Sequence, residues 1–166
     1  MGYCHALLAL PPMPNIFEPE FDHDRQRPPF RWRAARVGAQ AGAERLGATL
    51  YEVEPGGASS PLHAHHANEE MIIVLSGRPV LRTLEGEREL AVGEVVACPA
   101  GRAGAHRLDN RTDEPARVLF LSTKILPDAV EYPDSGKLGV VGADPQELRL
   151  ILRADATADY YEGEID

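Results

Sequence analysis

Apolar and polar positions alternate with a period of two in many short segments of this chain. Successive side chains of a strand point to opposite faces, so this period predicts β-structure. Glycine- and proline-containing turns separate the segments, and no long segment has the apolar spacing of an amphipathic helix. We therefore expect an all-β sandwich or barrel. The expected strands span residues 31–37, 46–54, 61–66, 70–77, 79–84, 87–92, 94–98, 105–110 and 116–123.

The segment 70–77, EMIIVLSG, carries apolar residues at both odd and even positions. A strand of this kind is expected to be covered on both faces. Segments 79–84 and 87–92 flank Glu85-Gly86, which predicts a hairpin around a glycine turn.

The C-terminal part is less regular. Residues 125–142 read as loop-rich. Segment 147–153 alternates like a strand, but Asp144-Pro145-Gln146-Glu147 before it also fits a helix start, so both alternatives stay open. We expect the acidic end to close over the body through Tyr160 and Tyr161 or to be partly disordered.

The N-terminal part differs in composition. Six prolines within residues 11–36 predict an extended arm, because each proline fixes φ and removes a hydrogen-bond donor. The arm's aromatic residues are expected to anchor it on a hydrophobic surface, either its own or a partner's; they are Phe17, Phe21, Phe30 and Trp32. We therefore divide the chain into an arm (1–36) and one domain (37–166). Met13 is an alternative start, which would make residues 1–12 an extension.

The overall composition sets further limits. The chain has 166 residues, enough for one domain that needs no disulfide. Its net charge of −9 argues against nucleic-acid and anionic-membrane partners, which need clustered positive charge. The apolar run near the N-terminus is too short to span a bilayer. We expect a cytoplasmic protein with Cys4 and Cys98 reduced.

Candidate chemistry concentrates in two places. His63, His65, His66, Glu69 and Glu70 fall within eight residues, next to the apolar strand 70–77. A further histidine, His106, follows 36 residues after Glu70. His63 and His65 should share one face of a strand. If strands 61–66 and 70–75 form a hairpin, Glu70 lies beside them, and His106 joins from a neighbouring strand. Three imidazoles and one carboxylate suit one divalent ion of Fe, Mn, Ni, Co or Zn, with coordination positions left open.

Other residues near these clusters have simpler readings. His66 should point away from His65, to the surface or an interface. Glu69 is the rival to Glu70, because a β-bulge would exchange their faces. Asp109 and Asn110 fit a turn. Three further residues could line a pocket and hold an anionic substrate: Tyr51, Arg82 and Arg107.

The two clusters resemble the paired motifs of the cupin superfamily. Gly57, five residues, His63-Ala64-His65, four residues, Glu70, six residues and Gly77 match the first motif. Gly93, five residues, Pro99-Ala100-Gly101, His106, three residues and Asn110 resemble the second. The sequence departs from the second motif in one respect, since four residues rather than two separate Gly101 from His106. The two motifs and the strands between them cover residues 46–123.

The resemblance implies a jelly-roll β-barrel (a double-stranded β-helix), with a metal near its mouth and commonly a homodimer. By the same resemblance the metal ligands are His63, His65, Glu70 and His106. The whole chain is also similar to small single-domain bacterial cupins that carry HHANEE, a long insert before the histidine and a YPDSGK segment.

Two functions remain open. In the first, the protein is a metal-dependent enzyme that performs dioxygenation, isomerisation or hydrolytic chemistry on a small molecule, with Glu70 also moving a proton. In the second, it is a non-catalytic protein that binds or senses a small ligand. Fold alone does not separate them.

Overall fold

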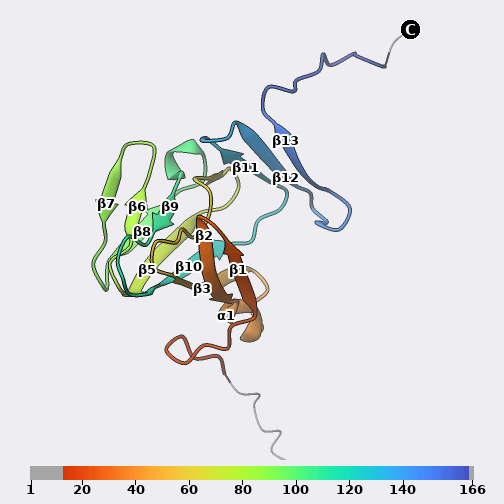
Figure 1. The fold of residues 1–166 in the computed structure, drawn as a ribbon. Coiled ribbons are helices and arrows are strands. Elements are labelled where there is room, and N and C mark those ends of the chain that lie inside the picture. The colour runs from red at the N-terminus through yellow and green to blue at the C-terminus, as the bar shows by residue number, and fades with distance from the viewer. Residues whose placement is uncertain (1–12, 165–166) are drawn as a thin grey trace, which may run out of the picture.

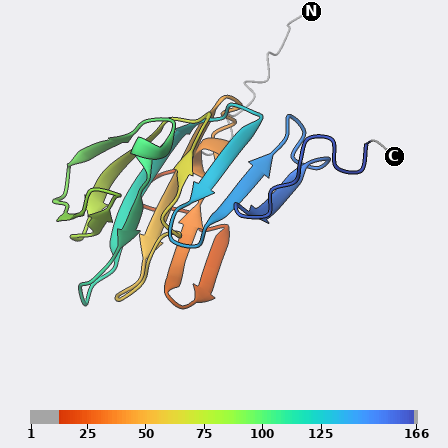
Figure 2. The same cartoon turned by 90° about the horizontal axis from the view of Figure 1, so that it is seen from above.

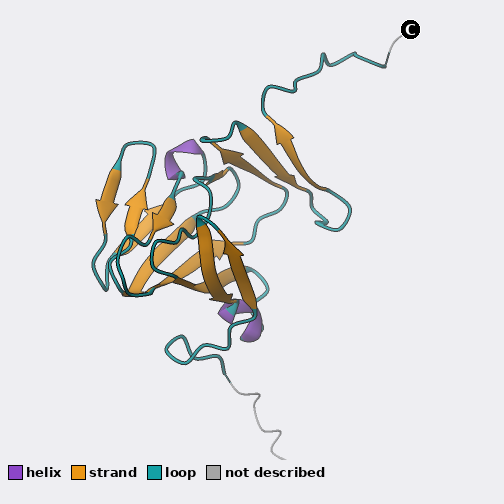
Figure 3. Cartoon of the chain, in the orientation of Figure 1, coloured by secondary structure: helices purple, strands orange, loops and turns teal. Residues whose placement is uncertain are grey.

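The computed structural model describes residues 13–164, whose regular secondary structure is almost entirely β-strand, joined by loops and turns (Figure 3). The helical parts of this range are one turn of α-helix, α1 (Val37–Gln40), and one 3-10 turn, η1 (Arg102–Gly104). The all-β prediction is confirmed. The predictions about Cys4 and an extension at residues 1–12 lie outside the described residues.

The largest sheet has six strands in the order β1-β2-β3-β10-β5-β8. Every neighbouring pair in it is antiparallel. Its strands are β1 (His23–Arg27), β2 (Phe30–Ala35), β3 (Leu46–Val53), β10 (Ala116–Thr123), β5 (Glu70–Ser76) and β8 (Val95–Cys98).

Two smaller sheets complete the fold. One has the order β7-β6-β9, with β6 (Val80–Arg82), β7 (Glu87–Glu89) and β9 (Arg107–Asp109). The other has the order β13-β12-β11-β4, with β4 (Ala64–His65), β11 (Asp128–Tyr132), β12 (Lys137–Val141) and β13 (Arg149–Arg153). Figures 1 and 2 both show β12 and β13 beside the rest of the barrel, beyond β11.

The core lies between the large sheet and the β6–β9 sheet. Ile72 and Val74 of β5 are at most 1% exposed and pack there with Leu81, Leu90 and Leu108. Burying an aliphatic side chain of this size stabilises the fold by about 2 kcal/mol.

The opposite face of the large sheet is also covered. Leu75 of β5 packs in a second cluster around Leu50, together with Ile16 and Phe21 from the N-terminal part. The prediction that strand 70–77 is covered on both faces is confirmed only in part, because Met71, on the same face as Leu75, is 39% exposed. Phe21 anchors the N-terminal part on the protein's own sheet, whereas Phe17 is 71% exposed.

The N-terminal part joins the large sheet. Strands β1 and β2 form a hairpin, and β2 pairs with β3, so the strand predicted at 31–37 is present. The hairpin turn contains Pro28 and Pro29, where missing donors disturb no ladder. The link between β2 and β3 contains the single helical turn α1.

The C-terminal part is more regular than predicted. Residues 125–142 contain strands β11 and β12, so the loop-rich reading was wrong. Segment 147–153 contains strand β13 rather than a helix. Tyr160 and Tyr161 are 86% and 58% exposed, so they do not close over the body. Within residues 13–164, no helix has the length and apolar character needed to cross a membrane.

Candidate metal centre

The two histidine clusters meet at the backbone. The N–H of His106 donates to the carbonyl of His63 at 2.9 Å, and the N–H of His63 donates back at 3.3 Å. The expected pairing of strands 61–66 and 70–75 was wrong, because β4 pairs with β11, and β5 pairs with β10 and β8. Glu70 therefore reaches the histidines from the large sheet.

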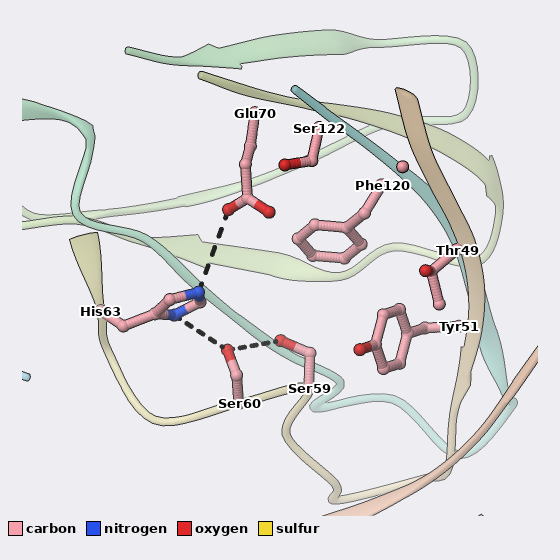
Figure 4. Close-up of a pocket in the computed structure, with 9 residues that line it drawn as sticks. Thr49, Tyr51, Ser59, Ser60, His63, Glu70, Phe120 and Ser122 are labelled. Carbon is pink, nitrogen blue, oxygen red and sulfur yellow. Dashed lines mark hydrogen bonds and ion pairs between the residues drawn. The ribbon is translucent and has the colours of Figure 1, made fainter. Parts of the chain in front are cut away.

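The three histidines converge on one carboxylate oxygen. The Nε2 atoms of His106, His65 and His63 lie 3.2, 3.8 and 3.9 Å from Glu70 Oε2. His63, Glu70 and His106 form the tightest group, in which the three ligand atoms lie within 4.8 Å of one another. His65 lies outside that group. Figure 4 shows His63 and Glu70 facing each other at one side of a pocket.

The other ring nitrogen of each histidine faces an oxygen. His63 Nδ1 lies 3.0 Å from the carbonyl of Pro61, and His106 Nδ1 lies 2.9 Å from that of Gly104. His65 Nδ1 lies 2.5 Å from Asp128 Oδ2. Carbonyl and carboxylate oxygens only accept, so each Nδ1 donates and each ring directs its Nε2 atom toward Glu70.

Two buried atoms of the site lack a hydrogen-bond partner: Glu70 Oε2 and His106 Nε2. They are 3.2 Å apart but misaligned for a hydrogen bond. Buried polar atoms are normally satisfied, and a divalent ion that replaces the proton of His106 would satisfy both the carboxylate oxygen and the imidazole nitrogen. Three imidazole nitrogens and a carboxylate oxygen fit a borderline divalent ion such as zinc or iron(II).

The pKa values of His106 and His63 are shifted in opposite directions. Burial lowers the pKa of His106, but the neighbouring Cys98 and the Glu70 carboxylate outweigh it and raise the value to about 10. Burial and the charges of the other histidines lower the pKa of His63 to about 4. Burial works against ionisation of Glu70, but the imidazoles, with His106 foremost, hold its pKa below the usual range. At neutral pH the proton between the carboxylate and the imidazoles therefore resides on His106.

The insert before His106 has a defined structure. Its residues form the 3-10 turn η1, whose Gly104 accepts from His106 Nδ1. A Cβ at Gly104 would lie 1.9 Å from the carbonyl oxygen of Pro99, so only glycine fits there. The insert thus fixes the orientation of His106.

The remaining candidates separate clearly. Glu69 is exposed, and Glu70 is the carboxylate that faces the histidines. His66 is also exposed and lies 3.7 Å from Glu131. Asn110 is buried, and its amide donates to the carbonyls of Val53 and Glu114, which agrees with a turn role.

Of the three predicted anion-binding residues, one lines the pocket beside Glu70. That residue is Tyr51, whose pKa is raised by burial and by the charge of Glu70. Arg82 instead forms two hydrogen bonds with the Asp134 carboxylate. Arg107 is paired with Asp109 at 2.6 Å.

The pocket itself is small and rich in hydroxyl groups. It has a volume of about 140 Å³, and the face of Phe120 forms part of its wall. His106 stacks obliquely on Phe120 at a ring distance of 5.9 Å. The lining side chains that carry a hydroxyl are Thr49, Tyr51, Ser59, Ser60 and Ser122 (Figure 4).

Sequence reasoning missed one residue of the site, Asp128. It is 6% exposed, and besides His65 it accepts from the backbone N–H of Ala67 at 2.9 Å. Burial raises its pKa, but these hydrogen bonds outweigh that effect and hold the pKa below its usual range. Asp128 is 63 residues from His65, in a segment read as loop, so nothing local in the sequence joined the two.

Comparisons with known proteins agree with this geometry. A family model described as Cupin domain matches residues 49–122. A sugar phosphate isomerase from Silicibacter pomeroyi, described as a cupin-superfamily protein, is 29% identical with a TM-score of 0.71, over 79% of this chain and 82% of that one. A candidate sugar phosphate isomerase from Acidithiobacillus ferrooxidans is 27% identical with a TM-score of 0.72 and the same coverage. A polyketide cyclase from Streptomyces resistomycificus is 26% identical with a TM-score of 0.50, over 58% and 68% of the two chains. The comparison with curated proteins found no match.

Proposed function

We propose that this protein, which belongs to the cupin superfamily through residues 49–122, is a divalent-metal-dependent isomerase of a small, sugar-like molecule. The observation that carries the proposal is the convergence of three histidine Nε2 atoms on Glu70 Oε2, an oxygen without a hydrogen-bond partner. Two structural relatives with TM-scores of 0.71 and 0.72 are named sugar phosphate isomerases, which favours isomerisation over dioxygenation or hydrolysis.

In this proposal His63, His65, Glu70 and His106 hold the ion. A bound divalent ion would act as a Lewis acid toward carbonyl and hydroxyl oxygens of the substrate. The Nδ1 atoms are held by Pro61, Asp128 and Gly104, so the three rings direct their Nε2 atoms toward the ion, and His106 gives up its Nε2 proton when the ion binds. Asp128 thus supports His65 in the manner of a carboxylate that orients a ligating imidazole.

The hydroxyl-lined pocket supports a polyhydroxylated substrate. Its side chains can both donate to and accept from sugar hydroxyls. Phe120 offers an apolar face on which the C–H groups of a sugar chain can rest. The hydroxyls of Thr49 and Tyr51 have no partner among the described residues, and a polyol offers them one that an aromatic hydrocarbon ring does not.

Isomerisation of a hydroxycarbonyl compound moves one proton between adjacent carbons and another between their oxygens. Glu70 is ionised, and its second carboxylate oxygen points into the pocket, where it could accept the carbon-bound proton and return it. The raised pKa of Tyr51 keeps its phenol neutral, so its O–H can donate to a substrate oxygen.

The test is NMR of metal-loaded protein in D₂O with a panel of aldoses, ketoses and their monophosphates. The protein is loaded separately with Fe(II), Mn(II), Ni(II), Co(II) and Zn(II). We expect conversion of one aldose–ketose pair, with deuterium entering at the carbon next to the carbonyl. Tyr51→Phe should keep the metal and lose at least tenfold in kcat, since general acid–base groups contribute about 10²- to 10⁴-fold.

Absence of conversion with every loaded metal would refute isomerisation. Oxygen uptake with a substrate of the panel would instead assign dioxygenation. Ligand binding without turnover would leave the non-catalytic role.

A further inference from the structure

A second, larger cavity opens onto the metal centre. It has a volume of about 570 Å³ and lies between the barrel and the strands β11–β13. His63, His65 and Tyr51 form the part of its lining nearest the metal centre. His63 and Tyr51 also line the small hydroxyl-rich pocket, so the two spaces adjoin at these residues.

The outer part of this cavity carries positive charge. Lys124, which follows β10, and Arg149, which begins β13, both contribute to its wall. Within residues 13–164 neither side chain forms an ion pair, although the chain has 26 acidic residues against 17 lysines and arginines. Two cations that face one cavity in an acidic chain, and that lack carboxylate partners there, favour an anionic ligand.

A third cation adds to the positive charge of the same region. Lys137 lies over the ring of Tyr132, a cavity residue, at 5.6 Å from the centroid. Burial raises the pKa of Tyr132, and the charge of Arg149 opposes that rise, which places the guanidinium near the phenol. Two positive groups, Lys137 and Arg149, thus lie near the Tyr132 ring.

The carboxylates of this region already interact with other groups. Asp128 is the one carboxylate among the described residues of the cavity wall, and it accepts from His65 and from the N–H of Ala67. Glu131, on the same strand, pairs with His66 and Arg102. No described carboxylate therefore neutralises Lys124 or Arg149.

The site thus has two ends of different chemistry. The inner pocket offers hydroxyl groups and the face of Phe120, and the outer cavity offers Lys124 and Arg149. A neutral sugar would use only the inner end. A molecule with a polyol chain and a terminal phosphate would use both, because phosphate needs positive donors and the polyol needs hydroxyl partners.

We propose that Lys124 and Arg149 form the phosphate-binding subsite for a monophosphorylated sugar whose carbonyl end lies at the metal centre. This inference rests on the proposed function for the placement of the carbonyl, and on the two cations for the phosphate. The subsite confers specificity for phosphorylated substrates: a sugar without phosphate leaves both cations unpaired.

The test is calorimetric binding to zinc-loaded protein at about 0.15 M salt. The probes are monophosphates of four- to six-carbon aldoses and ketoses, each beside its unphosphorylated sugar, and inorganic phosphate. We expect at least one sugar monophosphate to bind at least tenfold more tightly than its matched sugar. Lys124→Gln and Arg149→Gln should each weaken that binding about tenfold, as expected for the loss of one charge-assisted contact.

Two controls make the result specific. Arg25→Gln removes an exposed arginine on β1, outside the cavity, and should bind the monophosphate like the parent. Zinc content should be equal in all variants, because none of these residues belongs to the metal centre. Weakening in Arg25→Gln equal to that in Arg149→Gln would show unspecific attraction and overturn the proposal.

The proposal is also overturned if every monophosphate binds no better than its sugar, or if Lys124→Gln and Arg149→Gln leave the affinity unchanged. Binding does not require turnover, so the two proposals can fail separately. Tight phosphate-dependent binding without conversion would refute the proposed isomerase activity and support the phosphate-binding subsite. Conversion of unphosphorylated sugars alone would support the isomerase and overturn the phosphate-binding subsite.

Discussion

His65 Nδ1 lies 2.5 Å from Asp128 Oδ2, which joins the first histidine motif to strand β11 across 63 residues of sequence. The carboxylate is almost fully buried and holds the imidazole with its Nε2 atom toward Glu70. Mutation of a residue that hydrogen-bonds to a metal-ligating histidine typically lowers metal affinity by about 10- to 100-fold.

We therefore expect Asp128→Asn to weaken metal binding by at least about tenfold while the protein stays folded. The measurement is competition with a chromophoric chelator, with circular dichroism as the check on folding. Glu131→Gln is the matched control, since it removes a carboxylate from the same strand that contacts His66 and Arg102 instead. Equal affinities for the two variants would contradict the positioning role.

Metal uptake should release a proton. The pKa of His106 is raised to about 10, so in the metal-free protein its Nε2 is protonated at neutral pH and must lose that proton to bind an ion. We expect the metal dissociation constant to fall roughly tenfold per pH unit between about pH 7 and 9. Calorimetry in buffers of different ionisation enthalpy should show about one proton released from this ring. His106→Gln should lose that release, and a pH-independent affinity in the parent would refute the assignment.

Gly104 has no room for a side chain. A Cβ there would lie 1.9 Å from the carbonyl oxygen of Pro99, so Gly104→Ala must move the backbone that accepts from His106 Nδ1. We expect a loss of about 1–3 kcal/mol in the free energy of unfolding, measured with urea, and weaker metal binding. Ala103→Ser, at an exposed position of the same turn, should behave like the parent. If Gly104→Ala kept the parent's stability and affinity, the turn would have no role in placing the histidine.

The edge strand β13 exposes apolar side chains. Leu150, Ile151 and Leu152 are 46%, 64% and 47% exposed at the end of their sheet. Exposed apolar edge strands favour pairing with another chain, so we expect a homodimer that uses this edge. Light scattering at micromolar concentration should give about twice the mass of 18.1 kDa, and Leu152→Glu should give the monomer mass. A monomeric parent would contradict this expectation.

The sequence identified the four metal-ligand candidates because their spacing is local. His63, His65 and Glu70 lie within eight residues, and His106 follows a glycine–proline turn at the end of a strand. It could not identify the partners of β4, because strand pairing depends on long-range register. Glu70 therefore reaches the histidines from another sheet than expected.

The cavity residues were missed for a similar reason. Asp128 comes from a segment in which prolines and polar residues obscure the strand pattern, and Lys124 directly precedes that segment. Arg149 comes from a segment for which strand and helix both stayed open. The apparent helix start at Asp144 was a real local signal, since its carbonyl and carboxylate accept from the following N–H groups. In the structure those bonds close a turn between β12 and β13 instead.

The central claim is that the two histidine clusters hold one metal ion. The most direct test is elemental analysis of untagged protein purified without chelator, beside the His63→Ala, His106→Ala double variant. We predict close to one equivalent of a divalent metal in the parent, and its loss in a double variant that keeps the circular dichroism of a folded β-protein. A parent that stays metal-free after incubation with Fe(II), Mn(II), Ni(II), Co(II) and Zn(II), or a folded double variant that keeps its metal, would contradict the account.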